Sequence, residues 1–302
     1  MRFVQPSAAK LNLSLRVTKK RGDGYHDIVS VFLRLPPLET LLISARAEGD
    51  EVRVYGVDIG KEGKDKENGN ENIVARGLMY AREAGYEIPF LDVEILKTLY
   101  PGSGLGAGSG NGAAILRWLA GGNGFAKEHR DDLSCLAWRD VALKMGADVP
   151  FLFSEIPLAL VSGIGEVIEP LEPLNLKPRL HALIVFPSWS VGTGNAYSQL
   201  DRRCGSVYPL DETAARTEAE NLCRKLRSGE RVGLLPNDFT PGLLEEFPDY
   251  GKLFDVFEKK GSCAWGITGS GGAAFALSSE ASSPLAFQWP LEMRQVLSVV
   301  VS

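Results

Sequence analysis

The chain has 302 residues, a formal net charge of −5 and 44% hydrophobic residues. This length is sufficient for one large domain or two medium domains, each with its own core. The acidic balance argues against a nucleic-acid partner, which would favour a basic face. No run is apolar and long enough to span a bilayer, and the first residues lack the apolar region of a signal peptide. We therefore expect a cytoplasmic protein with no membrane partner.

The cysteines and histidines show no metal-binding pattern. The four cysteines have no CxxC spacing, and the three histidines, at positions 26, 129 and 181, are widely separated. We therefore expect free thiols in a reducing compartment and no site of His and Cys metal ligands.

Residues 9–17 alternate between apolar and polar side chains, which predicts a half-buried strand. Lys10 and Asn12 lie side by side on its polar face. From this strand alone, a solvated lysine on an edge strand is the simpler interpretation of Lys10.

A turn with two glycines at 19–24 precedes Tyr25 and His26. These two side chains could stack on a flat ring and form hydrogen bonds with it, or they could be ordinary residues beside a turn, which the residues alone favour. Apolar stretches at 28–35, 41–45 and 52–57 predict further strands of an antiparallel sheet. The polar segment 60–70 predicts an exposed loop, and Asn72 can cap a helix that ends near Ala84.

Six glycines occupy every second position from Gly102 to Gly112, between a strand predicted at 91–96 and a helix that begins near Ala113. Such a run is unsuited to a packed strand or a helix interior, because each glycine loses backbone entropy and buries no side chain. Strand, glycine loop and helix start form a phosphate-binding arrangement, since backbone N–H groups can crowd an anion there. A flexible linker is the alternative. The lysine of a Walker A loop is absent.

A second helix ends at Met145 before Gly146, and its start is predicted at Asp131 or Asp132. Asp148 then enters an apolar run, where it is either a helix-end aspartate or a general base or metal ligand. Further on, the patterns predict a hairpin at 159–170, a strand at 181–186, an amphipathic helix at 211–228, one or two helices at 241–260, and a strand, glycine turn and strand at 265–277. We place a domain boundary near residues 155–175.

Three segments together resemble the motifs of the GHMP kinase superfamily, which phosphorylates galactose, homoserine, mevalonate and related small molecules. They are Ala9–Leu13, the central glycine-rich stretch before a helix, and Thr268–Gly271. Further segments, AKLNLSLRVTKKRGDGYHD, GADVPFLF, SGIGEVIEPL, VGTGNAYSQLD, LPNDF and TGSGGAAFAL, are similar to the family of 4-diphosphocytidyl-2-C-methyl-D-erythritol kinases. The resemblance covers roughly residues 5 to 277.

The glycine stretch departs from the family pattern, which reads roughly PMGGGLGGGSSDAA. Ser103 interrupts the first glycines, Ala107 replaces a glycine, and Gly110 replaces the second serine, while Ser109 is kept. Loop hydroxyls are associated with phosphate and magnesium in the superfamily, so the resemblance leaves the magnesium ligands unassigned.

The resemblance implies an α+β protein with two domains and an active site between them. Residues 1–160 would form a domain like domain 2 of ribosomal protein S5, and residues 161–302 a ferredoxin-like domain. It implies ATP and Mg²⁺ as cofactors and 4-diphosphocytidyl-2-C-methyl-D-erythritol, an intermediate of the non-mevalonate isoprenoid route, as the substrate that is phosphorylated on its 2-hydroxyl. The alternatives are another GHMP kinase of the homoserine or mevalonate type, or an inactive homologue that binds a ligand.

The resemblance also implies roles for individual residues. Asp148 would be the general base, with Lys10 beside it. Substrate would be bound by Asn12, Tyr25, His26, Thr193, Gly269 and Ser270. ATP phosphates would be bound by Pro101, Gly102, Ser103, Gly104, Leu105, Gly106, Ala107, Gly108, Ser109, Gly110 and Asn111.

Overall fold

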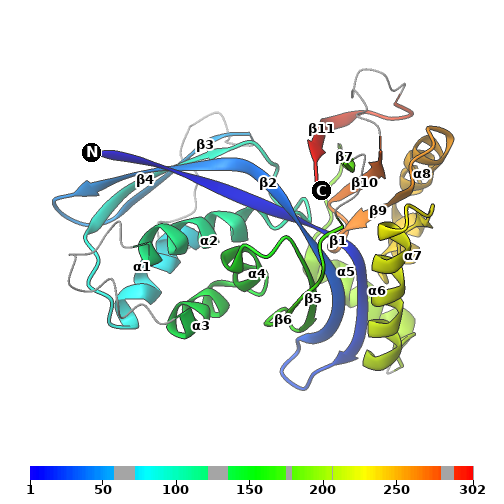
Figure 1. The fold of residues 1–302 in the computed structure, drawn as a ribbon, viewed down its shortest axis with the longest axis horizontal. Helices are drawn as coiled ribbons and strands as arrows, with labels where there is room; N and C mark the ends of the chain where they lie inside the picture. The colour runs from blue at the N-terminus through cyan, green and yellow to red at the C-terminus, as the bar shows by residue number, and fades with distance from the viewer. Residues whose placement is uncertain (58–71, 122–134, 175–178, 206, 280–288, 302) are drawn as a thin grey trace. The chain divides into compact units, whose positions relative to one another are not determined.

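A computed structural model describes residues 1–57, 72–121, 135–174, 179–205, 207–279 and 289–301 (Figure 1). The chain forms two compact units. The first comprises Met1–Ala9, Pro37–Pro101 and Gly106–Glu155, and the second comprises Lys10–Pro36, Gly102–Leu105 and Ile156–Ser302. The units therefore interleave along the sequence, whereas the predicted division at residues 160 and 161 gives two continuous segments. The predicted loop at 60–70 and the predicted helix start at Asp131 or Asp132 lie outside the described residues.

Helices and strands are both numerous, which agrees with the predicted α+β class. The helices are α1 (Ile73–Glu83), α2 (Ala107–Ala120), α3 (Cys135–Met145), α4 (Val149–Ser154), α5 (Thr193–Cys204), α6 (Glu212–Arg227), α7 (Thr240–Glu246) and α8 (Asp249–Lys259). The strands are β1 (Arg2–Lys20), β2 (His26–Arg46), β3 (Glu51–Gly56), β4 (Phe90–Lys97), β5 (Leu158–Gly163), β6 (Val167–Pro170), β7 (His181–Pro187), β8 (Gly233–Leu234), β9 (Ala264–Thr268), β10 (Ala273–Ser278) and β11 (Met293–Val300). Within the described ranges, every helix is too short or too polar to cross a membrane.

In the first unit the strand order is β3-β4-β2, and Figure 1 shows α1 and α2 on one side of these strands. β2 pairs with β4 antiparallel, as predicted, with Leu41 opposite Ile95. β3 pairs with β4 in parallel, with Val52 opposite Val93, so the antiparallel prediction is wrong for β3. The reason is the connection, because α1 lies between the two strands in sequence and such a crossover joins parallel strands.

β2 is one long strand rather than the two strands predicted at 28–35 and 41–45. It pairs with β5 over Ile28–Leu33 and with β4 over Thr40–Arg46. Pro36 and Pro37 lie between these two stretches and are exposed. Proline has no N–H to donate to a ladder, and at this position neither β4 nor β5 requires one.

Helix α2 begins at Ala107, six residues before the predicted start, and this corrects the expectation that the glycine run avoids a helix interior. A Cβ at Gly110 would lie 1.9 Å from the backbone oxygen of Ala8. A Cβ at Gly112 would lie 2.8 Å from the terminal carbon of Met145. At Gly110 the obstacle is backbone, so the close approach of α2 to Ala8 requires glycine there, and this packing overrides the low helix propensity of the residue. At Gly112 the obstacle is the end of a flexible side chain, which can move.

In the second unit, β5 and β6 form the predicted hairpin, and a second sheet has the order β11-β7-β10-β9-β8. β9 and β10 are the predicted strand, turn and strand, paired antiparallel with Phe275 opposite Gly266. Figure 1 shows α8 beside these strands, and the core between the helices and the sheet includes Tyr250, Phe257 and Trp265. The helix predicted at 211–228 is α6, with the Asp211 side chain accepting a hydrogen bond from Ala214 N at 2.8 Å.

The polar face of β1 is buried, which corrects the expectation of a half-buried strand and of a solvated lysine. Lys10, Asn12 and Ser14 are each 3% exposed or less. Farther along the same face, Arg16 donates to Glu218 of α6 at 2.6 Å and to Asp238 at 2.6 Å. Burial of such groups requires hydrogen-bond partners, and their presence explains why alternation alone gave the wrong exposure.

Candidate active site

Lys10 lies at the start of a buried polar network within the second unit. Its ammonium nitrogen donates to Asn12 Oδ1 at 2.6 Å and to the backbone oxygen of Gly104 at 3.0 Å. The same nitrogen lies 4.9 Å from the centre of the Phe32 ring. A charged lysine is rarely buried unless it is paired. Here the two acceptor oxygens and the Phe32 ring stabilise the buried cation.

Asn12 is the centre of the network, because its amide both donates and accepts. Oδ1 accepts from Lys10 and, at 2.8 Å, from the backbone N–H of Gly269, while Nδ2 donates to Ser30 Oγ at 2.9 Å. The backbone N–H of Asn12 donates to Thr268 Oγ1 at 3.1 Å. The asparagine thus joins two of the three motif segments, and Lys10 adds the third through Gly104.

The two glycine turns of the second unit are packed backbone against backbone. Gly104 has φ of +75°, and a Cβ there would lie 2.2 Å from the backbone oxygen of Thr268. A Cβ at Gly272 would lie 1.8 Å from the backbone oxygen of Gly102. Neither glycine can be replaced without moving backbone, so these residues set the path of the stretch 102–105.

The rest of the glycine stretch belongs to the first unit and forms the N-terminus of α2. Gly106 is the N-cap with φ of 65°, no side chain caps this end, and the first turn carries no acidic residue. The first N–H groups of a helix have no partner within the helix, and they attract anions. A Cβ at Gly108 would meet nothing within 4 Å. This open, uncapped helix start fits a phosphate group.

Asn111, which is predicted to bind phosphate, has its amide nitrogen turned into the first unit. Nδ2 donates to Glu39 Oε2 at 2.7 Å, and Asn111 is 3% exposed. Glu39 is also buried, and its other oxygen accepts from the backbone N–H of Thr98 and Leu99. The amide nitrogen therefore links α2 to Glu39 of β2, and Glu39 in turn holds the two residues that follow β4.

Asp148 directly precedes the short helix α4 in the first unit. Its side chain forms no capping hydrogen bond with that helix, and the residue is partly exposed. The four residues that follow it, Val149 to Leu152, are buried, and Arg117 of α2 donates to the backbone oxygen of Leu152 at 2.6 Å. The backbone that carries the Asp148 carboxyl is therefore fixed by packing.

The predicted substrate residues of the second unit lie in the turn before β2, at the start of α5 and in the turn between β9 and β10. Tyr25 is 60% exposed in the turn before β2, and its N–H donates to Asp23 Oδ1 at 3.0 Å. His26 Nε2 lies 2.7 Å from Asp201 Oδ1. Thr193, at the start of α5, accepts a hydrogen bond at 3.1 Å from the hydroxyl of Ser270 in the second glycine turn. The structure thus connects Thr193 to the turn that contains Gly269.

Sequence reasoning missed three residues that surround His26: Tyr197, Asp201 and Tyr208. The His26 and Tyr197 ring centres are 4.6 Å apart, and Tyr208 donates to Asp201 at 2.6 Å. The helix α5 was not predicted. Had it been, the spacing of four between Tyr197 and Asp201 would have placed both on one helical face.

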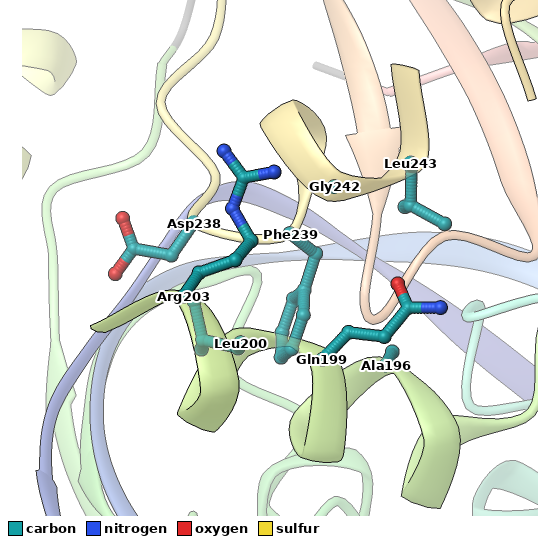
Figure 2. Close-up of a pocket in the computed structure, with 8 residues that line it drawn as sticks. All are labelled: Ala196, Gln199, Leu200, Arg203, Asp238, Phe239, Gly242 and Leu243. Carbon is teal, nitrogen blue, oxygen red and sulfur yellow. The ribbon is translucent and has the colours of Figure 1, made fainter. Parts of the chain in front are cut away.

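A small pocket lies between α5 and the start of α7 (Figure 2). Its lining contains none of the residues predicted to bind substrate or ATP. The residues that line it are Ala196, Gln199, Leu200, Arg203, Asp238, Phe239, Gly242 and Leu243.

Within the ranges that the structure describes, no three His, Cys, Asp or Glu side chains gather in a way that could hold a metal ion. Magnesium in kinases is commonly held by one or two carboxylates together with the phosphates of the nucleotide. We therefore assign no residue of this chain to magnesium.

Known proteins are similar to this chain in sequence and in fold. Residues 214–288 match the protein family described as "GHMP kinases C terminal". A 4-diphosphocytidyl-2-C-methyl-D-erythritol kinase of Porphyromonas gingivalis is 31% identical over 90% of both chains. One of Nitratidesulfovibrio vulgaris is 34% identical over 90% of this chain and 88% of its own.

Solved structures of similar fold include an enzyme of the same name as these relatives. A crystal structure of 4-(cytidine 5'-diphospho)-2C-methyl-D-erythritol kinase has 25% identity and a TM-score of 0.68, and the match covers 92% of this chain and 90% of that one. Homoserine kinase from Cytophaga hutchinsonii, at 18% identity, has the same fold with a TM-score of 0.67, covering 100% of this chain and 94% of its own. The fold is that of the GHMP kinases. Within them, the chain belongs to the family of 4-diphosphocytidyl-2-C-methyl-D-erythritol kinases.

Proposed function

We propose that this protein transfers the γ-phosphoryl group of ATP to the 2-hydroxyl of 4-diphosphocytidyl-2-C-methyl-D-erythritol, in the non-mevalonate route to isoprenoid precursors. Membership of the family supports this reaction. The structural observation that carries it is the buried network of Lys10, Asn12, Gly104 and Thr268, because it joins the three motif segments around one buried cation.

Phosphoryl transfer depends mainly on positioning and on neutralising charge. The stretch from Pro101 to Asn111 would bind the phosphates of ATP through backbone N–H groups, and the uncapped start of α2 supports this role. Magnesium, when bound, would screen the charge of those phosphates. The family likeness supports ATP use, and the magnesium ion is part of the proposal.

Two residues would carry the chemistry. Asp148 would accept the proton of the substrate hydroxyl as general base. Lys10 would stabilise negative charge on the attacking oxygen. The hydrogen bonds of its ammonium group to Asn12 and Gly104 support this role, because they hold a buried cation.

The remaining site residues would bind the substrate. Tyr25 offers an exposed ring for stacking on cytosine, and His26 would form a hydrogen bond with the base. Thr193, Gly269 and Ser270 would line the same site, which the hydrogen bond between Thr193 and Ser270 supports.

A substrate panel tests this proposal. Purified protein with ATP and magnesium is given the cytidine compound, homoserine, mevalonate or galactose, and ADP release is measured. Of the four alcohols, we expect only the cytidine compound to give rapid ADP release. Equal release with homoserine or mevalonate would favour the alternative of another GHMP kinase, and no release with any alcohol would favour an inactive, ligand-binding homologue.

A further inference from the structure

The imidazole of His26 is fixed on several sides by residues of the second unit. Its Nε2 lies 2.7 Å from Asp201 Oδ1, and the His26 side chain is only 8% exposed. One face of the ring packs on Tyr197 at 4.6 Å between centres, and Tyr208 meets the ring edge-on at 6.1 Å. These contacts hold the ring in one orientation, with Nε2 directed at Asp201.

Asp201 is held in its ionised form. Burial alone would raise the pKa of this carboxyl, but hydrogen bonds from Lys20, Tyr208 and His26 outweigh it and lower the pKa to about 2. An ionised carboxylate only accepts hydrogen bonds. Oδ1 accepts from the Tyr208 hydroxyl at 2.6 Å, so the contact with His26 requires a hydrogen on Nε2 of the imidazole.

A neutral imidazole carries a single N–H. With the hydrogen on Nε2, Nδ1 has a free lone pair and accepts hydrogen bonds. Cytosine presents an amino group as a donor at the position where uracil-type bases present a carbonyl oxygen as an acceptor. An acceptor at Nδ1 therefore matches cytosine and repels the lone pair of a uracil oxygen.

We propose that Asp201 is a specificity-determining positioning residue: it holds the hydrogen of His26 on Nε2 and so presents Nδ1 as an acceptor for the amino group of cytosine. This inference rests on the proposed function for the identity of the base. Asp201 acts through His26 and does not itself contact the substrate.

Lys20 determines how an asparagine side chain at position 201 would be oriented. Its ammonium group donates to Asp201 Oδ2 at 2.5 Å, and a lysine side chain has donors only. In Asp201→Asn, the amide oxygen is expected to face Lys20 and the amide nitrogen to face His26. The amide would then donate to Nε2, which moves the hydrogen to Nδ1 and converts the acceptor into a donor.

The test combines kinetics with nitrogen NMR on the full-length protein. The ratio of kcat/KM for the cytidine diphosphate substrate to that for its uridine diphosphate analogue is measured in wild type and in Asp201→Asn. We expect the ratio to fall at least tenfold in the variant, with the KM for ATP unchanged. In ¹⁵N spectra, the His26 signals, identified by their loss in His26→Gln, should show hydrogen on Nε2 in wild type and on Nδ1 in Asp201→Asn.

Glu245→Gln is the matched control. It removes an exposed carboxylate of α7 that pairs at 2.6 Å with Arg203, a residue of α5, the helix that also carries Asp201. It should leave both the kinetic ratio and the His26 signals as in wild type. Asp201→Glu, which keeps a carboxylate, should retain more of the cytidine preference than Asp201→Asn.

Several results would overturn the inference. A wild-type His26 with hydrogen on Nδ1, or on both nitrogens, contradicts it even if Asp201→Asn does not fold. A ratio in Asp201→Asn within twofold of wild type also contradicts it. If wild type does not phosphorylate the cytidine substrate at all, the proposed function fails, whereas the NMR result and the relative binding of CDP and UDP still decide the role of Asp201.

Discussion

Lys10 and Gly104 are joined by a hydrogen bond of 3.0 Å from the lysine ammonium group to the glycine backbone oxygen. The same oxygen lies 3.3 Å from the hydroxyl of Thr268. One backbone carbonyl in the glycine stretch therefore receives donors from β1 and from the end of β9. Its position depends on the absence of a side chain at residue 104.

Gly104→Ala tests this packing, with Gly102→Ala as its matched control. Both glycines have a positive φ, +75° and +70°, so alanine costs about 1–2 kcal/mol of backbone strain at either position. At Gly104 the added Cβ also collides with Thr268, whereas at Gly102 it meets nothing within 4 Å. We expect Gly104→Ala to lower the free energy of unfolding by a further ~1–3 kcal/mol. Urea denaturation of both variants measures this, and equal losses would contradict the packing.

Gly110→Ser tests a position where the structure reverses an expectation from sequence. Serine is the family's usual residue here, so the resemblance predicts that it is tolerated. The structure leaves no room, because the Cβ would lie 1.9 Å from Ala8 O. We expect a loss of about 1–3 kcal/mol in unfolding free energy. Gly108→Ser, in the same helix but in open space, should be neutral or slightly stabilising. A fully stable Gly110→Ser would show that α2 and β1 are farther apart than this.

The sequence patterns predicted much of the fold but not the environment of polar residues. Alternation located β1, yet it assigned Lys10 and Asn12 to an exposed face, because alternation does not show that Thr268, distant in sequence, supplies partners. Propensity ended the glycine loop at Ala113, because the contact of Gly110 with Ala8 is invisible in a local window. Asp201 was missed for the same reason, because the residues that it contacts, His26 and Lys20, lie on other elements.

Acid stability should depend on Asp201. The folded pKa of its carboxyl is about 2, below the ordinary value of 3.8, so the group stabilises the fold above its unfolded pKa and loses that contribution as the pH falls through its folded pKa. The difference in unfolding free energy between wild type and Asp201→Asn should therefore shrink between about pH 4 and pH 2. Urea denaturation at several pH values measures it. A difference that stays constant over this interval would show that the pKa is not lowered.

The proposed catalytic pair makes a kinetic prediction. Asp148→Asn should lower kcat by roughly 10²–10⁴-fold, the range for a general base, and leave the affinity for ATP nearly intact. Lys10→Met should also lower kcat. If the two residues act as a unit, the double variant should be little slower than the slower single variant. Steady-state kinetics on the three variants decides this, provided that their thermal melting shows folded protein. Multiplicative losses would indicate independent roles.

The central claim, a kinase specific for the cytidine-linked alcohol, is tested most directly by comparing two acceptors in one assay. Purified protein is supplied with ATP, magnesium and either 4-diphosphocytidyl-2-C-methyl-D-erythritol or the same alcohol without its cytidine diphosphate, and kcat/KM is measured from ADP release. Stacking on Tyr25 is worth about 1–3 kcal/mol, and hydrogen bonding of the base adds to the discrimination. We expect kcat/KM to be at least ~10²-fold higher for the cytidine compound. Equal values for the two acceptors, or no ADP with either, would contradict the account.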